Sequence, residues 1–238
     1  MTRSTQSPPV GDQALIQREH WEHDQSERRS PSHPAVRALF EPRAEFIASL
    51  VADAARASVL DVGCGNGFLT VPLEARFERV VGVDYSPAMI AANPAKEKLV
   101  GDAMALPFAG KSFDVVVASH LLHHLTAEDR ARSVREMARI ARRAVVLYEP
   151  NRYNPLMFLF GLLQKHERMV LEFSPAHVRG LIRETGFTTC STRIEGLTTP
   201  NLCPAWWGRV TRPLERTPLR VLGFYIRAVA TCGERSAA

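Results

Sequence analysis

A glycine-rich stretch holds the residues whose types and spacing have the clearest chemical use. Asp61 precedes three glycines at every second position, in the sequence Asp-Val-Gly-Cys-Gly-Asn-Gly that ends at Gly67. Glycine allows a sharp backbone turn and lets a ligand come within contact distance of the main chain. An apolar run before the stretch and a helical pattern after it predict a strand, a loop and a helix in that order. Because the amides at a helix start attract anionic groups, this order predicts a nucleotide-type cofactor site.

The spacing of these glycines differs from that of the dinucleotide-binding fingerprint. The fingerprint is G-x-G-x-x-G, whereas this loop reads G-x-G-x-G with an acidic residue two positions ahead. The loop therefore resembles the first motif of the class I S-adenosylmethionine-dependent methyltransferases. The resemblance implies methyl transfer from S-adenosyl-L-methionine, with S-adenosyl-L-homocysteine as the product. It also implies an α/β fold with a Rossmann-like, doubly wound, mostly parallel sheet of about seven strands, the last one antiparallel, and helices on both faces.

Two further acids follow strand-like runs downstream of the loop. Asp84 ends the run at 80–84, where a carboxylate could accept hydrogen bonds from both hydroxyls of a ribose. Asp102, with Ala103, resembles the adenine contact of the methyltransferases. Each acid taken alone is also compatible with a surface position after a strand. The expected donor-binding residues are Asp61, Gly63, Cys64, Gly65, Gly67, Asp84, Tyr85, Met89, Asp102, Ala103, Met104 and Ser119.

Three histidines follow the fourth apolar run and are the candidate catalytic residues: His120, His123 and His124. In a helical turn their spacing of three and four places them on one face. An imidazole with its pKa of about 6.5 could take a proton from a hydroxyl or ammonium acceptor. A packed, hydrogen-bonded structural histidine is the alternative, and it stays open for each. We expect no metal, because the histidines lack a nearby carboxylate in the sequence and hard ions prefer oxygen ligands.

The acceptor side is predicted from three residues, Trp21, Glu149 and Asn151. Glu149 ends the fifth strand-like run, and a carboxylate is costly to bury without a partner. Acceptor binding and pairing with an arginine or backbone amide are therefore both open for it. Trp21 either packs on the domain or belongs to a lid formed by residues 13–30 and 154–172. The apolar residues of the second lid segment favour a lipophilic or aromatic small-molecule acceptor.

Alternating short apolar runs and helical patterns must position these residues, and they predict a parallel sheet with crossover helices. We expect residues 1–40 to form a disordered tail and a helical lid. Residues 41–238 are expected to form one methyltransferase domain, with insertions at 151–172 and 198–220 that shape the acceptor pocket. The expected strands are 59–62, 80–84, 98–102, 113–119, 144–148, 187–194 and 223–232, and the expected helices include 42–54, 126–142 and those starting at Ser86 and Ser174.

The charge composition and the residues after the fourth strand argue against a nucleic-acid acceptor. The net charge of +5 comes mostly from scattered arginines without a basic block, which argues against a nucleic-acid binder. Exocyclic-amine methyltransferases of flipped bases usually carry an Asn/Asp-Pro-Pro-Tyr/Phe motif after the fourth strand, and residues 119–122 read Ser-His-Leu-Leu. A nucleic-acid methyltransferase and an inactive binding protein with this fold are kept as alternatives. We expect a cytoplasmic protein without a membrane span, and its oligomeric state is left open.

Overall fold

The computed structural model describes residues 29–232, except 198, 200–203, 205, 207–210, 212 and 214–216. The predicted lid segment 13–30, with Trp21, lies almost entirely outside the described residues, as does much of the insertion at 198–220. No helix in the described part of the chain has the length and hydropathy that a membrane crossing requires.

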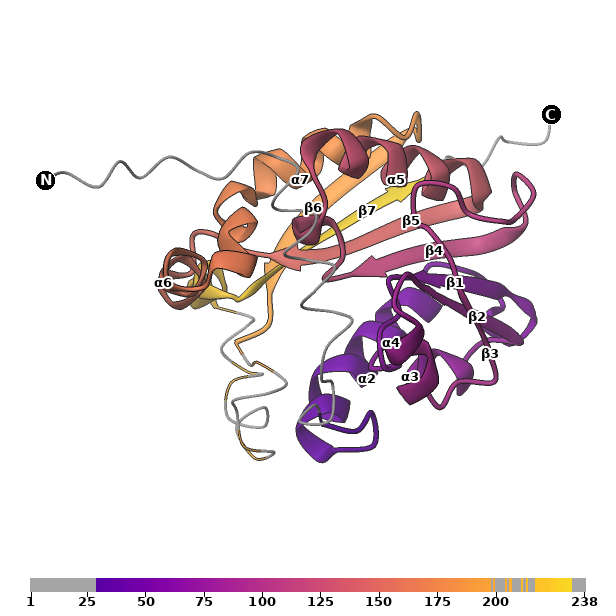
Figure 1. Cartoon of the computed structure of the whole chain (residues 1–238), viewed down its shortest axis with the longest axis horizontal. Helices are drawn as coiled ribbons and strands as arrows, with labels where there is room; N and C mark the ends of the chain where they lie inside the picture. Colours follow the sequence, from indigo (N-terminus) through magenta and orange to yellow (C-terminus); the bar gives the residue numbers. More distant parts are fainter. Residues whose placement is uncertain are drawn as a thin grey trace, which may run out of the picture.

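Seven strands of the described chain form one sheet in the order β3-β2-β1-β4-β5-β7-β6 (Figure 1). Strands β1 to β5 pair in parallel, and β7 runs antiparallel between β5 and β6. This confirms the predicted Rossmann-like, mostly parallel sheet. The strand order reverses between β1 and β4, the place where open α/β sheets bind ligands. The strands are β1 (Ser58–Val62), β2 (Arg79–Asp84), β3 (Glu97–Val100), β4 (Phe113–Ser119), β5 (Ala141–Pro150), β6 (Thr189–Glu195) and β7 (Tyr225–Thr231).

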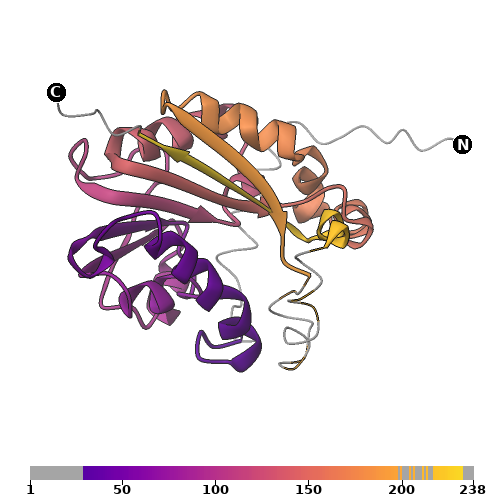
Figure 2. The same ribbon diagram turned by 180° about the vertical axis from the view of Figure 1, so that it is seen from behind.

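Helices cover both faces of the sheet, as the view from behind also shows (Figure 2). On one face, α2 (Pro34–Ala48) and α3 (Thr70–Glu74) bury a core cluster that includes Ile47 and Leu73. On the other face, α5 (Ala127–Ile140) and α7 (Pro175–Arg183) bury a second cluster that includes Met137 and Ile182. The remaining helical elements are α4 (Pro87–Ala92), α6 (Pro155–Leu163) and the 3-10 segments η1 (Ala54–Arg56), η2 (Leu122–His124), η3 (Lys165–Glu172) and η5 (Pro218–Leu222).

The predicted helix starts at Ser86 and Ser174 are confirmed. The Ser86 hydroxyl accepts a hydrogen bond from the amide of Met89 at 3.3 Å, and Ser174 accepts one from His177 at 3.1 Å. Proline follows each serine at the first helical position, where its missing N–H costs nothing. These serine caps and the prolines after them determine the residues at which α4 and α7 begin.

The helix expected at residues 42–54 is wrong at both ends, because α2 runs from Pro34 to Ala48. The ring of His33 caps it, accepting a hydrogen bond from the Ala35 amide at 3.1 Å, and Pro34 occupies the favoured first position. Burial of the N-terminal half of α2 stabilises the helix although Pro42 lies inside it. The domain boundary drawn at residue 40 therefore falls within a helix.

Tertiary pairing also moves several other predicted ends. The helix expected to reach residue 142 stops at Ile140, and β5 occupies Ala141–Pro150 instead of 144–148. This strand is longer than expected because it has a partner on each side, β4 and β7. By contrast, β3 pairs only with β2 and ends at Val100, two residues before Asp102. The last two strands lie within two residues of their predicted bounds.

We predict that Phe40→Ala lowers the free energy of unfolding by about 3–5 kcal/mol, because the ring is 4% exposed and its removal leaves a cavity. Chemical denaturation measures this loss. The exposed Arg37→Ala on the same helix is the control and should change stability by about 0.5 kcal/mol or less. Equal effects of the two substitutions would mean that α2 is not an integral part of the folded unit.

Candidate functional site

The glycine loop turns between β1 and α3 and is tied to the neighbouring strand by its own backbone. The amides of Gly63 and Cys64 both donate to the carbonyl of Val83 on β2, at 2.8 and 3.0 Å. Gly67 has φ 92°, and a Cβ there would lie 2.5 Å from the Oδ1 of Asn93. Gly65 has φ 52°, and a Cβ there would meet no described atom within 4 Å. Such an uncrowded backbone position is suited to close approach of a ligand.

The carboxylate of Asp84 is oriented by the loop that it faces. Its Oδ2 accepts a hydrogen bond from the amide of Gly65 at 2.8 Å, and its Oδ1 accepts one from the amide of Ser86 at 2.9 Å. One acidic side chain therefore joins the end of β2 to the glycine loop and to the start of α4. This places the carboxylate beside the open position at Gly65.

The side chain of Asp61 points into the protein, toward α3, and not toward the open position at Gly65. Its side chain is buried, and Oδ2 accepts a hydrogen bond from the Thr70 hydroxyl at 2.7 Å. Burial raises the pKa of Asp61 to about 7; the Thr70 hydrogen bond opposes this rise, and the negative charge of Asp84 adds to it. Asp61 therefore connects β1 to the first turn of α3, which supports the loop from below.

The other predicted donor-binding residues separate into buried and accessible ones. Cys64 and Met89 are buried, and burial chiefly raises the pKa of the Cys64 thiol, so it is held protonated. Tyr85 is 42% exposed. Asp102 is exposed, and its Oδ1 accepts a hydrogen bond from the amide of Met104 at 2.8 Å. Ala103 packs partly buried against the core cluster of α5 and α7.

Glu149 organises the turn that follows β4. This fully buried carboxylate accepts hydrogen bonds from the amides of Leu121 and Leu122 at 3.2 and 2.8 Å, and a longer one from the amide of His123 at 3.4 Å. Its Oε2 also lies 2.7 Å from Nδ1 of His123. Because a carboxylate only accepts, Nδ1 carries the proton. Of the two alternatives for Glu149, the structure shows pairing with backbone amides.

His123 lies between two carboxylates. Its Nε2 is 3.6 Å from Oε2 of Glu167, which comes from η3. Burial alone would lower the pKa of His123, but the hydrogen bond and charge of Glu149, together with the charge of Glu167, raise it above its usual value. His124 stacks obliquely on it, with ring centroids 3.9 Å apart.

Ligand atoms of His123, His124 and Glu167 all lie within 4.8 Å of one another, which is close enough for a metal ion. The same geometry also suits a protonated imidazole bridging the two carboxylates, and a proton on Nε2 occupies the lone pair that a metal would need. The raised pKa of His123 favours the second arrangement. The expectation of no metal therefore stays a prediction. One of its reasons, the lack of a carboxylate near the histidines, is wrong, because the fold places Glu167 beside His123.

His120 and Ser119 are joined to a residue that the sequence analysis missed. Arg43 of α2 has its Nη1 3.3 Å from the hydroxyl of Ser119 and 3.3 Å from Nε2 of His120. A guanidinium only donates, so Nε2 of His120 accepts and carries no proton. His120 has φ 61°, an unusual backbone conformation for a residue with a side chain, and its amide donates to the carbonyl of Tyr148 at 2.7 Å.

Arg43 is 3% exposed, and its guanidinium is surrounded by aromatic rings. It lies 4.4 Å from the ring centroid of Tyr225, 4.5 Å from that of Tyr148 and 5.0 Å from that of Phe40. Within the described residues, Nε and Nη2 have no hydrogen-bond partner and no carboxylate pairs with this cation. Cation–π contacts offset only part of the cost of burying a charge. The sequence does not indicate that Arg43 contacts Ser119 and His120, because an arginine in a helix is usually a surface residue.

The side chain of Asn151 also forms its hydrogen bonds within the protein. Its Nδ2 donates to the carbonyl of Gly223 at 2.8 Å, and its Oδ1 accepts from the amide of Tyr153 at 3.2 Å. The structure thus brings Ser119, His120, His123 and Glu149 together at the ends of β4 and β5, while Asn151 links β5 to the start of β7. Trp21 lies outside the described residues.

Comparison with known proteins agrees with this fold. Residues 60–148 match the family model of a methyltransferase domain. A demethylmenaquinone methyltransferase of Corynebacterium glutamicum is 35% identical over 115 residues, 48% of this chain and 49% of that protein. A probable tRNA methyltransferase 9B of Mus musculus is 37% identical over 86 residues, 34% of this chain and 19% of that protein.

A solved structure covers more of the chain. The magnesium protoporphyrin IX methyltransferase of Synechocystis with bound S-adenosylhomocysteine superposes with a TM-score of 0.58 at 18% identity, covering 92% of this chain and 94% of that one. The chain spans about half the length of the demethylmenaquinone methyltransferase that it matches. Residues 60–148 are therefore similar to the methyltransferase domain family, and the solved structure has the same Rossmann-like fold as this chain.

We predict that Asp61 makes stability depend on pH. Its folded pKa of about 7 lies above the ordinary value of 3.8, so its contribution to stability is complete at low pH and is lost as the pH rises through about 7. Asp61→Asn cannot ionise. The free energy of unfolding of the wild type should therefore fall relative to that of the variant, by at most about 4 kcal/mol between about pH 4 and about pH 8.

Denaturant titrations across this pH range measure the difference. Asp53→Asn, at an exposed carboxyl, is the control and should show no such trend. A difference between Asp61→Asn and the wild type that stays constant with pH would contradict the burial argument.

We predict that neither folding nor donor binding needs a divalent metal, because the two carboxylates stabilise a proton on His123. Protein treated with a chelator should keep its melting temperature, and added Mg²⁺ or Zn²⁺ should not raise it. Stoichiometric Zn²⁺ binding that disappears in Glu167→Gln but persists in the exposed Glu128→Gln would overturn this prediction.

Proposed function

We propose that this protein transfers a methyl group from S-adenosyl-L-methionine to a small-molecule acceptor. The observation that carries the proposal is the loop of Gly63, Gly65 and Gly67 with Asp84 held against it by the Gly65 amide, in a domain similar to the methyltransferase family. When bound, the donor supplies a methyl group already activated by the positive sulfur. The task of the protein is then to hold donor and acceptor in line.

The donor-side residues fit this ligand in their chemistry. We assign the ribose hydroxyls to Asp84, because its carboxylate accepts hydrogen bonds and is aimed by two backbone amides. We assign the adenine edge to Asp102 and the backbone of Ala103, at the exposed end of β3. Asp61 supports the loop through Thr70, so we give it an indirect role. The uncrowded backbone of Gly65 permits the close approach that the assignment requires.

On the acceptor side we assign the proton-accepting role to His120. Its Nε2 carries no proton, and it can take one from the acceptor once the acceptor displaces the Arg43 N–H, whereas both carboxylates around His123 favour a protonated ring. We therefore give His123 and Glu149 a positioning role. A catalytic part for His124 stays a prediction, and it is the alternative if His120 proves dispensable.

An aromatic or lipophilic acceptor is the finer part of the proposal. The rings of Phe40, Tyr148 and Tyr225 gather around Arg43 beside His120, which suits an acceptor with an aromatic body and a polar or anionic group. A demethylmenaquinone methyltransferase among the relatives supports this class. The match to a tRNA methyltransferase keeps a nucleic-acid acceptor as the second candidate, although it covers only 34% of this chain.

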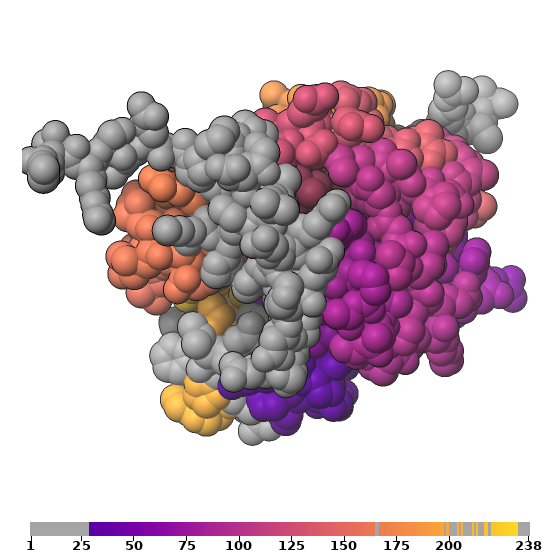
Figure 3. Space-filling model, in the orientation of Figure 1, coloured from indigo at the N-terminus to yellow at the C-terminus, as the bar shows by residue number. Residues whose placement is uncertain are grey.

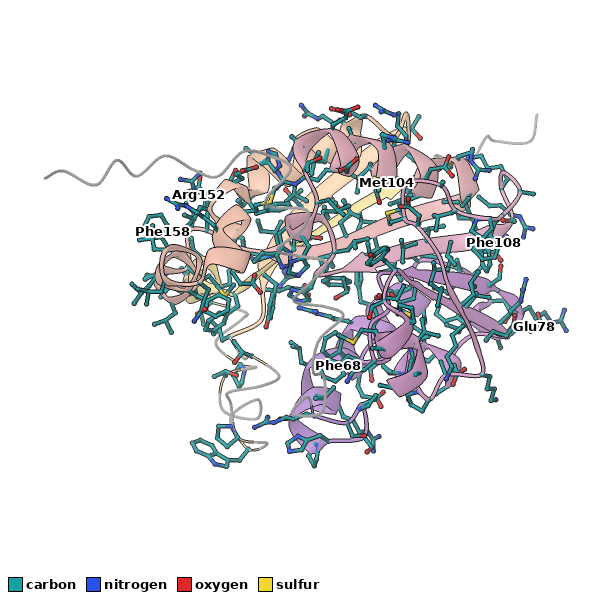
Figure 4. The ribbon with its side chains drawn as sticks, in the orientation of Figure 1. Phe68, Glu78, Met104, Phe108, Arg152 and Phe158 are labelled. Carbon is teal, nitrogen blue, oxygen red and sulfur yellow. The ribbon has the colours of Figure 1, made fainter. Side chains whose placement is uncertain are left out.

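We predict that the wild-type chain binds S-adenosylhomocysteine and that Asp84→Ala weakens this binding by about 1–3 kcal/mol, because the hydroxyl groups lose their acceptor. Isothermal titration calorimetry measures both. Glu78→Ala is the matched control, since this exposed acid precedes β2 at the opposite end of the strand (Figure 4). The absence of measurable binding of either the donor or its product to the wild type would refute the proposed function.

A further inference from the structure

Helix α6 packs against η3 on one side and leaves most of its apolar side chains exposed. Its sequence is Pro-Leu-Met-Phe-Leu-Phe-Gly-Leu-Leu, and among its nine residues only Gly161 is buried. The space-filling view shows its orange side chains at one end of the molecule (Figure 3). Large apolar groups at successive positions are exposed: Leu156 65%, Phe158 41%, Leu159 50%, Phe160 41%, Leu162 54% and Leu163 71%. A contiguous exposed apolar surface of this kind marks an interaction site.

The helix is fixed to the domain and not loosely attached. Asn154, in the turn between β5 and α6, caps the helix and accepts hydrogen bonds from the amides of Leu156 and Met157 at 2.9 and 3.0 Å. The same side chain donates to the carbonyl of Leu222 in η5, so the exposed Val221 and Leu222 lie beside the start of α6. We call α6, Val221 and Leu222 together the apolar tip.

Three arginines flank the apolar tip: Arg152 before α6, Arg168 in η3 and Arg220 in η5. Figure 4 shows both Arg152 and Phe158 at this end of the molecule. None of the three forms an ion pair with a carboxylate among the described residues, whereas Arg76, Arg139 and Arg227 do. Among the described residues, the tip therefore combines an apolar surface with arginines that form no ion pair.

We propose that the apolar tip docks on the surface of an anionic lipid bilayer, with α6 lying in the interface and the arginines contacting lipid phosphates. Apolar side chains next to basic ones bind such surfaces through area burial and charge attraction together. At nine residues, α6 extends about 14 Å, too short to cross a bilayer, so it lies in the interface. The proposal goes beyond methyl transfer and does not depend on it.

A second copy of this chain is the competing occupant, and the charges disfavour it. A twofold interface places the same surface of both copies together. Docking two apolar tips would bring two sets of three arginines toward one another without carboxylates from the tip to pair with them. Lipid phosphates carry the opposite charge and remove this repulsion.

The test uses the full chain and vesicles of phosphatidylcholine, with or without phosphatidylglycerol, in a sedimentation assay. We expect binding to the anionic vesicles and at least tenfold weaker binding by Leu159→Glu and by Leu163→Glu. Val100→Glu is the matched control, because Val100 is also 50% exposed but lies on β3 at the far edge of the sheet. Circular dichroism and thermal melting verify that each variant is folded.

The charge contribution is tested separately with the double variant Arg168→Gln, Arg220→Gln. It should bind the anionic vesicles severalfold less tightly and with a weaker dependence on salt, whereas Arg132→Gln, at an exposed position of α5, should behave as the wild type. No vesicle binding by the wild type, or unchanged binding by the α6 variants, would overturn the proposal. A concentration-dependent dimer in ultracentrifugation that Leu163→Glu dissociates, without vesicle binding, would assign the tip to a second copy instead.

Discussion

The buried carboxylate of Glu149 is the group on which the acceptor side of the site depends. A buried charge is costly without partners, and this one is stabilised by backbone amides of the turn after β4 and by the ring of His123. One side chain at the end of β5 therefore determines how the chain leaves β4. His120, with its unusual φ of 61°, lies directly before the first amide that donates to Glu149.

Helix α5 also stabilises the turn after β4, through Arg130. Arg130 is fully buried, donates from Nε to the carbonyl of Leu122 at 2.9 Å and pairs with Glu172 at the end of η3. Since η3 also supplies Glu167, this segment is part of the site and not only a cover over it. Within the segment 154–172, η3 supplies Glu167 beside His123, whereas the apolar side chains of α6 are exposed; the lid function of this segment stays a prediction.

The two halves of the site are built by different kinds of interaction. The donor side consists mainly of backbone: a loop with three positive φ angles, two amides donating to Val83 and two amides aiming Asp84. The proposed acceptor side consists of charged side chains, namely the buried Arg43 of α2 and Glu149 of β5 and the partly buried Glu167 of η3.

The sequence by itself determined the elements whose causes are local. The glycine loop, the serine caps of α4 and α7 and the succession of strands and helices along the chain could be predicted because neighbouring residues dictate them. Only the tertiary structure decided that α2 begins at Pro34, that Arg43 reaches His120 and that Glu167 lies beside His123. Arg43 and His120 are 77 residues apart in the chain. Contacts over such separations depend on how helices pack on the sheet, and no local pattern of residue types records that packing.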